Sequence, residues 1–311
     1  MKCPACQSQR LIRNGGGSAG QRMQCKDCGH SPMLSSVPPS HRRHFIIPDR
    51  QIKPGVPMDH NEWIGRAIAE YKPDSVIDLG DNADFPSMST HSAVGSRDKE
   101  GQRLLADINA ANEGERLLMQ GKGDFEPDER VRLRGNHEHR LTRFIDANPV
   151  LEGIIGLHLL DDDGWDIVPY ADGQPGIRHI DGVAYAHYFA NPNTGKPIAG
   201  TIDNRLSKIG SSFVQGHAQG LKRGNMQYAT GVTRYGVVAG SAYMHDEPYK
   251  GASNSHWRGV LVLNEVRDGE FCEMPLTLDY LCRKYEKMSV GQFLRKKYKN
   301  AEQRFTLARL P

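Results

Sequence analysis

The sequence predicts an α/β protein built on two β-sheets and preceded by a small cysteine-rich β-ribbon. Three observations predict this fold class: two CxxC motifs at the start, a strand, helix, strand order over residues 44–136, and short strands joined by tight turns from about residue 177. With 311 residues, 38% of them hydrophobic and 25% charged, the chain can bury a sizeable globular core. The start lacks a signal-peptide pattern and no run of about 18 apolar residues predicts a membrane span, so we expect a cytoplasmic protein without a membrane partner.

Four of the six cysteines form two CxxC pairs, Cys3 with Cys6 and Cys25 with Cys28, and 18 residues separate the pairs. Four thiolates at this spacing suit one structural, tetrahedral zinc ion, and the intervening chain is long enough for a hairpin. Two disulfides are the alternative, which the reducing compartment expected for this chain disfavours. A ribbon of residues 1–32 is too small to form a core, so we expect the metal to supply its folding free energy.

The ribbon carries basic residues that indicate a polyanionic partner. Arg10, Arg13 and Arg22 lie between the cysteine pairs, where their guanidinium groups can meet phosphates. Lys and Arg outnumber acids by seven to one in residues 1–44 and by nine to two in residues 283–311, whereas acids prevail by 34 to 24 between them. This distribution favours a nucleic-acid partner at the ends and a carboxylate-rich site in the middle.

The stretch CPAC…RNGGGSAGQRMQCKDCG resembles the N-terminal zinc ribbon of insertion-sequence transposases, which contacts DNA. The resemblance implies that the ribbon binds nucleic acid. Zinc ribbons also connect proteins to one another, so a protein-docking ribbon stays open as the alternative.

A Pro- and Ser-rich linker, residues 33–43, is expected to separate the ribbon from the main domain, residues 44–282. In that domain HFIIP, SVIDLGD and RVRLRGN have the apolar character of buried strands. Apolar residues recur at helical spacing in HNEWIGRAIAEYK and from about Arg97 to Gln120. The segments IRHIDGVAYAHY and WRGVLVLNEVRDGEFCEM read as hairpins of a second sheet, and residues 283–311 as a basic C-terminal tail.

Ligand-type side chains follow the predicted strands, where the chain turns. In open α/β sheets, the carboxyl ends of the strands are where ligands bind. Donors at five such corners, several of them beside a glycine, would be an unusual set if each were structural. The set comprises Asp49 and Gln51, then Asp81 and Asp84, then Asn136, His137 and Glu138, then His187, and last His217 with Gln219.

The ordered motifs D-x-Q, GDNAD, RGNHE, H and GHAQ resemble those of the calcineurin-like metallophosphoesterases, over about residues 44–265. This resemblance implies a two-sheet αββα metallophosphoesterase sandwich. The phrase LRGNHE is similar to the protein serine/threonine phosphatases of that superfamily, and the flanking phrases IKPGVPMDHNEWIG and HYFANPNTGKPIAG are similar to phage-encoded members.

The resemblance also implies a role for each residue at a centre with two divalent ions, where two-metal chemistry neutralises phosphate oxygens and activates water. The residues fall into metal ligands and groups that act on the substrate. The bridging carboxylate is Asp81; the first ion takes Asp49, Gln51 and Gln219; the second takes Asn136, His187 and His217; His137 acts on the leaving oxygen, Asp84 orients it, and Arg134 grips phosphate.

Gln51 and Gln219 depart from the family pattern, which has histidine at both positions. An amide oxygen is a harder donor than an imidazole nitrogen, so we expect a preference for manganese or magnesium, with zinc or iron as alternatives. The predicted function is hydrolysis of phosphate esters of nucleic acid through a metal-bound hydroxide, by a nuclease or end-processing phosphatase. The alternatives are a phosphomonoesterase acting on phosphoprotein or nucleotide, and a catalytically silent nucleic-acid-binding scaffold.

Overall fold

The computed structural model of the protein describes residues 6, 8–17, 20–31, 33–35, 41–90, 95–247 and 254–309. The contacts divide the chain into two compact units, Met1–His41 and Arg42–Pro311. In the part of the chain that the structure describes, no helix has the length and apolarity needed to cross a membrane.

The first unit is a three-stranded antiparallel ribbon with strand order β1-β2-β3. Its extent differs from the expected residues 1–32, because Met33–Ser35 pair with Gly20–Arg22 and so belong to the ribbon rather than to the linker. In a hairpin of two strands, the outer edge of the second strand (Gly20–Cys25) would keep unpaired backbone N–H and C=O groups. Pairing with Met33–Ser35 satisfies part of them. The strands are β1 (Leu11–Gly17), β2 (Gly20–Cys25) and β3 (Met33–Ser35).

The second unit contains a six-stranded mixed sheet with strand order β16-β15-β4-β5-β6-β7. Strands β4 to β7 run parallel, and the β15–β16 hairpin joins antiparallel at β4. Parallel strands direct their carboxyl ends to one edge, which brings the loops after β4, β5 and β6 together. The strands are β4 (Arg42–Ile47), β5 (Ser75–Asp78), β6 (Glu129–Leu133), β7 (Asp166–Val168), β15 (Gly259–Arg267) and β16 (Glu270–Thr277).

A five-stranded sheet, with strand order β10-β11-β12-β14-β13, packs against the first. The prediction that the hairpin of residues 257–274 belongs to this sheet was wrong, since β15 pairs with β4. Successive residues of β15 are buried on opposite faces of the strand: Leu261 lies in the cluster between the two sheets, and Val262 lies in the cluster under the helices that cover the first sheet. A strand in contact with both clusters belongs to the six-stranded sheet. The strands are β10 (Ile177–Ile180), β11 (Val183–Ala186), β12 (Ser212–Gln215), β13 (Leu221–Gln227) and β14 (Thr233–Ala239), and β8 (Tyr170–Ala171) with β9 (Gln174–Pro175) forms a separate small hairpin.

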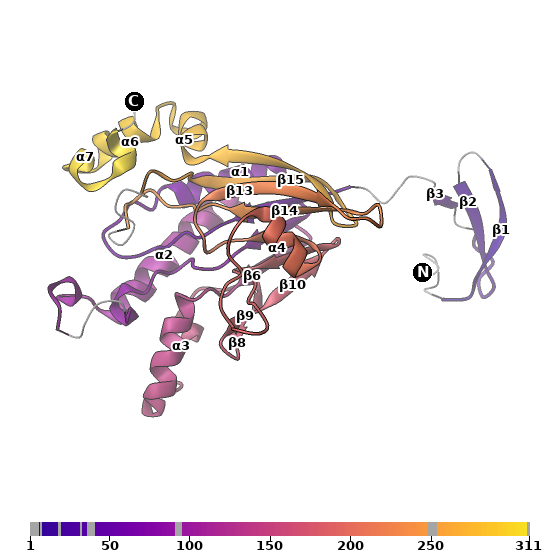
Figure 1. Ribbon diagram of the computed structural model, residues 1–311. Helices are drawn as coiled ribbons and strands as arrows, with labels where there is room; N and C mark the ends of the chain where they lie inside the picture. The colour runs from indigo at the N-terminus through magenta and orange to yellow at the C-terminus, as the bar shows by residue number, and fades with distance from the viewer. Residues whose placement is uncertain are drawn as a thin grey trace. The chain divides into compact units, whose positions relative to one another are not determined.

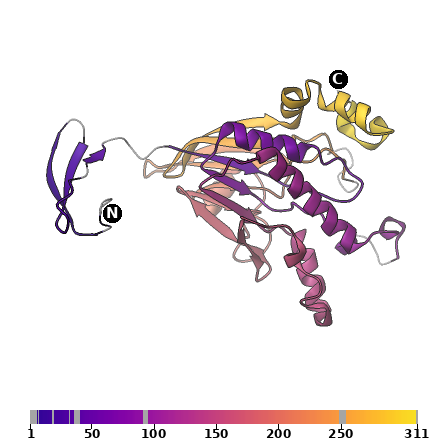
Figure 2. The same cartoon turned by 180° about the vertical axis from the view of Figure 1, so that it is seen from behind.

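Helices cover the outer face of each sheet. Figure 2 shows α1 (His60–Tyr71) and α2 (Leu104–Lys122), in purple, in front of the six-stranded sheet, whereas Figure 1 shows α4 (Ile202–Ile209) on the opposite side of the molecule. Three apolar clusters fill the spaces between the layers: one between α1 and α2 and the first sheet, one between the two sheets, and one beneath α4. The order of layers is therefore helix, sheet, sheet, helix.

Helices α1 and α2 cross in close contact because each has a glycine at the crossing. A Cβ added at Gly65 would lie 2.1 Å from the carbonyl oxygen of Leu118, and one at Gly121 would lie 2.1 Å from that of Glu62. The predicted helix from Arg97 begins later than expected, since η2 (Arg97–Lys99) is a separate turn before α2. The crossing fixes α2 over the sheet and so places its buried Glu115 beneath the strands.

The basic C-terminal segment is a folded part of the second unit. It forms α5 (Leu278–Glu286), α6 (Val290–Lys297), α7 (Ala301–Arg304) and η6 (Thr306–Arg309). Leu281 of α5, Leu294 of α6 and Phe305, directly after α7, lie in the core cluster of the first sheet. Periodic apolar residues thus face the core while the lysines and arginines lie on the outer side, so the segment expected as a tail is amphipathic helix.

Candidate metal centre

Three candidate ligands from three different strand ends meet at one point. One ligand atom each of Asp81, His187 and His217 lies within 4.8 Å of the others. Asp81 and His187 are buried and His217 is half-buried. They follow β5, β11 and β12, so the meeting point lies where the carboxyl ends of strands from both sheets come together. Carboxylate and imidazole at this separation suit a divalent cation.

His187 is held in the orientation that a metal ligand needs. Its Nδ1 donates to the carbonyl oxygen of Leu79 over 2.9 Å, which leaves Nε2 directed at the centre. That Nε2 lies 3.2 Å from Asp81 Oδ2 and 3.0 Å from Asn136 Oδ1. The structure therefore brings the predicted ligands Asn136 and Asp81 into contact with His187.

Asp49 joins the centre through the backbone of the neighbouring loop. The N–H of His217 donates to Asp49 Oδ1 over 2.9 Å, and a Cβ at Gly216 would lie 2.5 Å from the same oxygen. Position 216 therefore needs glycine if the carboxylate is to reach this position. Burial, supported by the charge of Asp81 and opposed by that of His187, raises the pKa of Asp49 to about 6.

Asp81 and His187, which are in contact, shift each other's pKa. Burial disfavours the charged form of Asp81, but His137 and His187 outweigh it and hold the pKa of Asp81 below its usual range. Burial likewise disfavours protonated His187, yet Asp81 and Asp49 raise the pKa of His187 to about 9. The carboxylates thus stabilise positive charge at this point, which is the electrostatic requirement of a cation site.

Gln51 and Gln219, predicted as ligands of the first ion, are both buried. The Gln51 N–H donates to the carbonyl oxygen of Asp81 over 2.8 Å, and Gln219 Oε1 accepts from the Tyr243 hydroxyl over 2.9 Å. Their φ angles are 41° and 57°, and Asp81 and His217 also have positive φ, at 52° and 64°. Left-handed backbone at non-glycine residues costs about 1–3 kcal/mol each and is concentrated at functional sites.

His137 and Asp84, which the sequence predicts to act together on a leaving group, are hydrogen-bonded to each other. His137 Nδ1 donates to Asp84 Oδ1 over 2.7 Å, and its Nε2 lies 3.7 Å from Asp81 Oδ2. Arg140 Nη2 approaches that Nε2 at 3.0 Å. Burial and Arg140 favour neutral imidazole, but Asp81 and Asp84 outweigh them and raise the pKa of His137. The ring is therefore oriented by Asp84, and its Nε2 is on the side of Asp81.

The sequence did not predict three residues that are linked to Asp84 by hydrogen bonds: Lys53, Glu247 and His245. Lys53 Nζ donates to Asp84 Oδ2 over 2.9 Å and to both oxygens of Glu247 over 2.7 and 2.8 Å. Glu247 Oε1 in turn lies 2.7 Å from His245 Nε2. Lys53 and Glu247 are 194 positions apart, and no motif marks either of them, so nothing in the sequence links them to Asp84.

Glu138 holds the loops that follow β5 and β6 in contact. Its Oε2 accepts the N–H groups of Gly135 and Asp81 over 2.9 and 3.1 Å, and its Oε1 accepts that of Ala83 over 3.0 Å. A Cβ at Gly135 would lie 2.1 Å from Asp81 Oδ1, so the two loops touch. The sequence showed an acid after GNH at the start of α3 (Glu138–Ala147), but not which backbone groups it binds.

Arg134, predicted to grip phosphate, lies directly before Gly135 and is buried. Its Nη2 pairs with Asp162, whose other oxygen, Oδ1, accepts from Arg132 over 2.9 Å. The Arg134 side chain lines a cavity beside the centre. Its guanidinium is thus fixed by a carboxylate and faces a space large enough for a ligand group.

The ribbon contains a second cluster suited to a metal. The sulfur atoms of Cys6, Cys25 and Cys28 lie within 4.8 Å of one another, and none of these described cysteines forms a disulfide. Hydrogen bonds from the backbone of Cys28 and Asp27 lower the pKa of Cys25 to about 6, which favours the thiolate that binds metal. The predicted fourth ligand, Cys3, lies outside the described residues.

The nucleic-acid-binding residues predicted in the ribbon are described only in part. Arg10 is exposed and pairs with Asp27, which neutralises part of its charge. The side chains of Arg13 and Arg22 lie outside the described residues.

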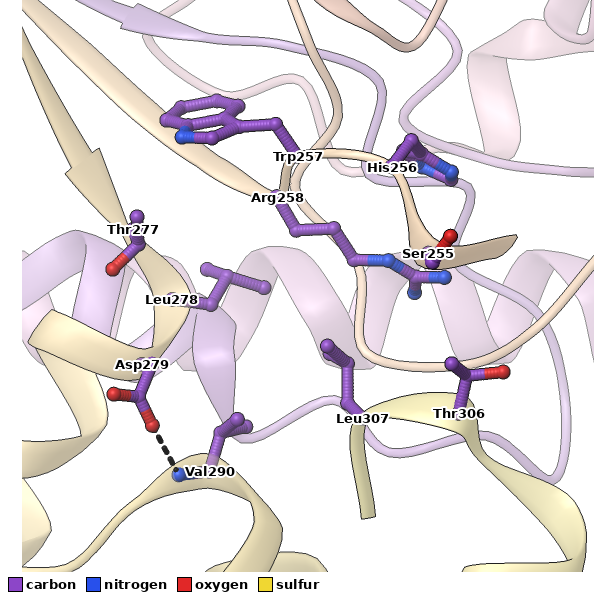
Figure 3. A pocket seen from close by; sticks show the side chains of 10 residues that line it. All are labelled: Ser255, His256, Trp257, Arg258, Thr277, Leu278, Asp279, Val290, Thr306 and Leu307. Carbon is purple, nitrogen blue, oxygen red and sulfur yellow. Dashed lines mark hydrogen bonds between the residues drawn. The ribbon is translucent and has the colours of Figure 1, made fainter. Parts of the chain in front are cut away.

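A cavity of about 250 Å³ lies between the C-terminal helices and the segment before β15, and Figure 3 shows its apolar side chains Leu278, Val290 and Leu307. Arg258 crosses this space but donates to the carbonyl oxygens of Tyr243 and Asn254 over 3.0 and 2.8 Å. Its described lining includes none of the predicted site residues. The cavity therefore has no part in the candidate centre.

No protein-family model and no curated protein matches the chain. Function is therefore inferred from the residues of the centre and their geometry.

Proposed function

We propose that the protein is a metal-dependent phosphoesterase of the calcineurin-like superfamily, with the αββα sandwich of that group, and that it hydrolyses phosphate esters of nucleic acid. The observation that carries this proposal is the cluster of Asp81, His187 and His217 at the ends of strands from two sheets. The buried carboxylate of Asp49 and the amide of Asn136 extend it. Few chemistries other than metal binding require so many convergent donors.

The donor set fits divalent ions, which would supply charge neutralisation for the phosphate oxygens and a deprotonated water. Asp81 would be a central ligand of these ions, since its buried carboxylate lies within 3.2 Å of Nε2 of His187, another proposed ligand. Asp49, Gln51 and Gln219 would complete the first site.

The residues of the chain then act on the leaving group and on the phosphate. His137, oriented by Asp84, would deliver a proton from Nε2 to the departing oxygen. Arg140, 3.0 Å from that nitrogen, would favour return of His137 to its neutral form after the transfer. Arg134 would bind a phosphate oxygen through a guanidinium that Asp162 holds in place.

Nucleic acid is the substrate class that best accounts for the rest of the chain. The cysteine cluster in the ribbon supports a zinc ribbon, and basic residues prevail at both ends of the sequence. Lys and Arg at the ends would attract phosphates, whereas the acidic middle would hold the ions.

The test is a substrate panel with the wild type and Asp81→Asn, each with Mn²⁺, Mg²⁺ or Zn²⁺. The panel comprises single- and double-stranded DNA, RNA, a 3′-phosphate oligonucleotide, a phosphopeptide and a small aryl phosphodiester. We expect hydrolysis of nucleic-acid esters by the wild type and none by Asp81→Asn. Asp203→Asn, at an exposed position of α4, is the matched control and should keep full activity. A phosphopeptide as the best substrate would favour a phosphomonoesterase, and no hydrolysis of any member would contradict the proposal.

The role of the ribbon is tested by removing residues 1–40. If the ribbon binds nucleic acid, the truncated chain should bind it more weakly and with a lower salt dependence. Hydrolysis of the small aryl phosphodiester should stay near the rate of the intact chain. Unchanged nucleic-acid binding would instead support a ribbon that docks to protein.

A further inference from the structure

A cavity of about 260 Å³ lies beside the candidate centre, and we call it the Arg134 pocket. Its walls come from the loop before α3, the first turns of α3, the segment around η4 (Leu157–Leu159), β7 and β8. The side chains that matter for its chemistry are Arg134, His139, Leu157, Ile167, Pro169 and Tyr170.

A series of aromatic rings connects this pocket to the metal ligands. His139 and Tyr170 stack, with ring centroids 4.3 Å apart and planes inclined by 20°. The Tyr170 hydroxyl lies 2.5 Å from that of Tyr188, whose ring centroid is 4.9 Å from that of His217. The wall of the pocket is therefore in packed contact, through Tyr170 and Tyr188, with the candidate ligand His217. Arg134, which lines the pocket, also directly precedes the loop that carries Asn136.

The pocket holds hydrogen-bond donors that the described residues leave unused. Arg134 is 3% exposed, and its Nε and Nη1 have no hydrogen-bond partner within the described ranges, and neither does the buried Nδ1 of His139. Asp162 pairs with Nη2 of Arg134 and also with Arg132, so its charge is shared. Buried polar groups without partners are costly. These nitrogens are closed off from solvent in this structure, so they would meet acceptor atoms of a ligand once the Arg134 and His139 side chains turn toward the pocket.

The size and lining of the pocket define the class of ligand. Sites for drug-sized molecules span about 300–1,000 Å³, so a cavity of about 260 Å³ accepts one ring system rather than a chain of nucleotides. Leu157, Ile167 and Pro169 offer apolar contact, the stacked His139 and Tyr170 offer an aromatic wall, and Arg134 offers donors. A flat heteroaromatic group with oxygen and nitrogen acceptors beside a phosphate matches all three features.

Resting on the function proposed above, we propose that the Arg134 pocket binds one unpaired nucleobase of the nucleotide whose phosphate ester is cleaved. A base can enter a pocket of this size only outside a duplex stack. The enzyme would accordingly act on single-stranded or terminal nucleotides in preference to paired ones.

The experiment compares two aryl phosphodiesters with the same leaving group, thymidine 5′-(p-nitrophenyl phosphate) and its analogue without the base, in the presence of Mn²⁺. Stacking of a base on aromatic side chains is worth about 1–3 kcal/mol, which corresponds to about 5- to 150-fold in affinity. We therefore expect the wild type to have a kcat/KM at least about tenfold higher for the ester with the base.

Substitutions in the pocket should change this ratio. In Tyr170→Ala and in Thr142→Trp, which fills the cavity from α3, the ratio of the two kcat/KM values should fall to about one. Tyr170→Phe keeps the ring and should keep the preference, which a loss of folding would not allow. Tyr280→Ala removes an exposed ring from α5 and is the matched control, expected to leave the ratio unchanged.

Equilibrium binding separates this inference from the proposed function. Calorimetry with AMP and with ribose 5-phosphate should show AMP binding at least about tenfold more tightly to the wild type, and equally weakly to Thr142→Trp. If AMP binds in this way but neither ester is hydrolysed with any metal, the pocket stands and the phosphoesterase proposal is wrong. If both esters are hydrolysed at equal rates and both phosphates bind equally, the pocket inference is overturned and the phosphoesterase proposal stands.

Discussion

Glu138→Gln tests whether one buried carboxylate holds the loops of the centre together. The two oxygens of Glu138 accept three backbone N–H groups, from Asp81, Ala83 and Gly135, over 3.1, 3.0 and 2.9 Å. Glutamine keeps one oxygen and turns an NH₂ group toward at least one of these donors, so one or two bonds are lost. A hydrogen bond to a charged group contributes about 1.5–3 kcal/mol, so the gross loss is about 2–6 kcal/mol.

The net loss of unfolding free energy is smaller than this, because ionising the buried carboxylate of Glu138 itself costs free energy. Burial and the nearby charge of Asp81 raise the pKa of Glu138, and a neutral amide removes that cost. We therefore expect a net loss near the lower end, about 2 kcal/mol of the free energy of unfolding. The backbone of Asp81 also loses its anchor, so Mn²⁺ affinity should fall by about 10- to 100-fold, as is common when outer-shell partners of metal ligands are changed.

The assay is urea unfolding followed by circular dichroism, together with calorimetric titration of Mn²⁺. Glu152→Gln is the matched control, since Glu152 is exposed, and its free energy of unfolding should stay within about 0.5 kcal/mol of the wild type. If Glu138→Gln unfolds at the same urea concentration as the wild type and binds Mn²⁺ equally well, the carboxylate does not hold these loops.

Three further predictions concern proton transfer, metal choice and pH. His137→Ala should lower kcat by at least about 100-fold while the number of bound ions per chain stays the same, since the ring acts on the leaving oxygen; loss of ions would refute this role. The double variant Gln51→His, Gln219→His should bind Zn²⁺ more tightly and change the order of activating metals, with smaller effects of each single change; additive singles and an unchanged order would leave these glutamines outside the site. Burial lowers the pKa of His60 to about 3, so the stability from neutral His60 is present above about pH 6.5 and is lost as pH falls toward 3. The difference in free energy of unfolding between wild type and His60→Gln should therefore change by about 1.4 kcal/mol per pH unit in that window, whereas a difference independent of pH would show that His60 does not titrate in this way.

Much of the centre could be predicted because its residues lie in short motifs at strand ends. Asp49 and Asp81 follow strands that the apolar pattern marks clearly, and the structure gives β4 and β5 at those places. His187 and His217 likewise end β11 and β12. Since carboxyl ends of parallel neighbours share one edge, local patterns suffice to indicate that such residues converge.

The supporting residues could not be predicted, because their roles depend on partners far away in the chain. Lys53 contacts Glu247 across 194 positions, and Tyr170 reaches His139 and Tyr188 only when β8 packs beside α3. Single residues of this kind carry no periodicity or spacing that would mark them.

The sequence by itself determined the main strands of the first sheet, the helix after β4 and the polar residues that follow these strands, because hydrophobic period and turn chemistry are local properties of the chain. Only the tertiary structure decided that the β15–β16 hairpin joins the first sheet, that the basic C-terminal segment packs its apolar face on the core, and that a pocket lies beside Arg134. These three outcomes depend on which buried surfaces pair with one another. Many arrangements of the same strands and helices are compatible with the local pattern. They differ in how completely apolar surface is buried and backbone donors are paired, and these are properties of the packed chain as a whole.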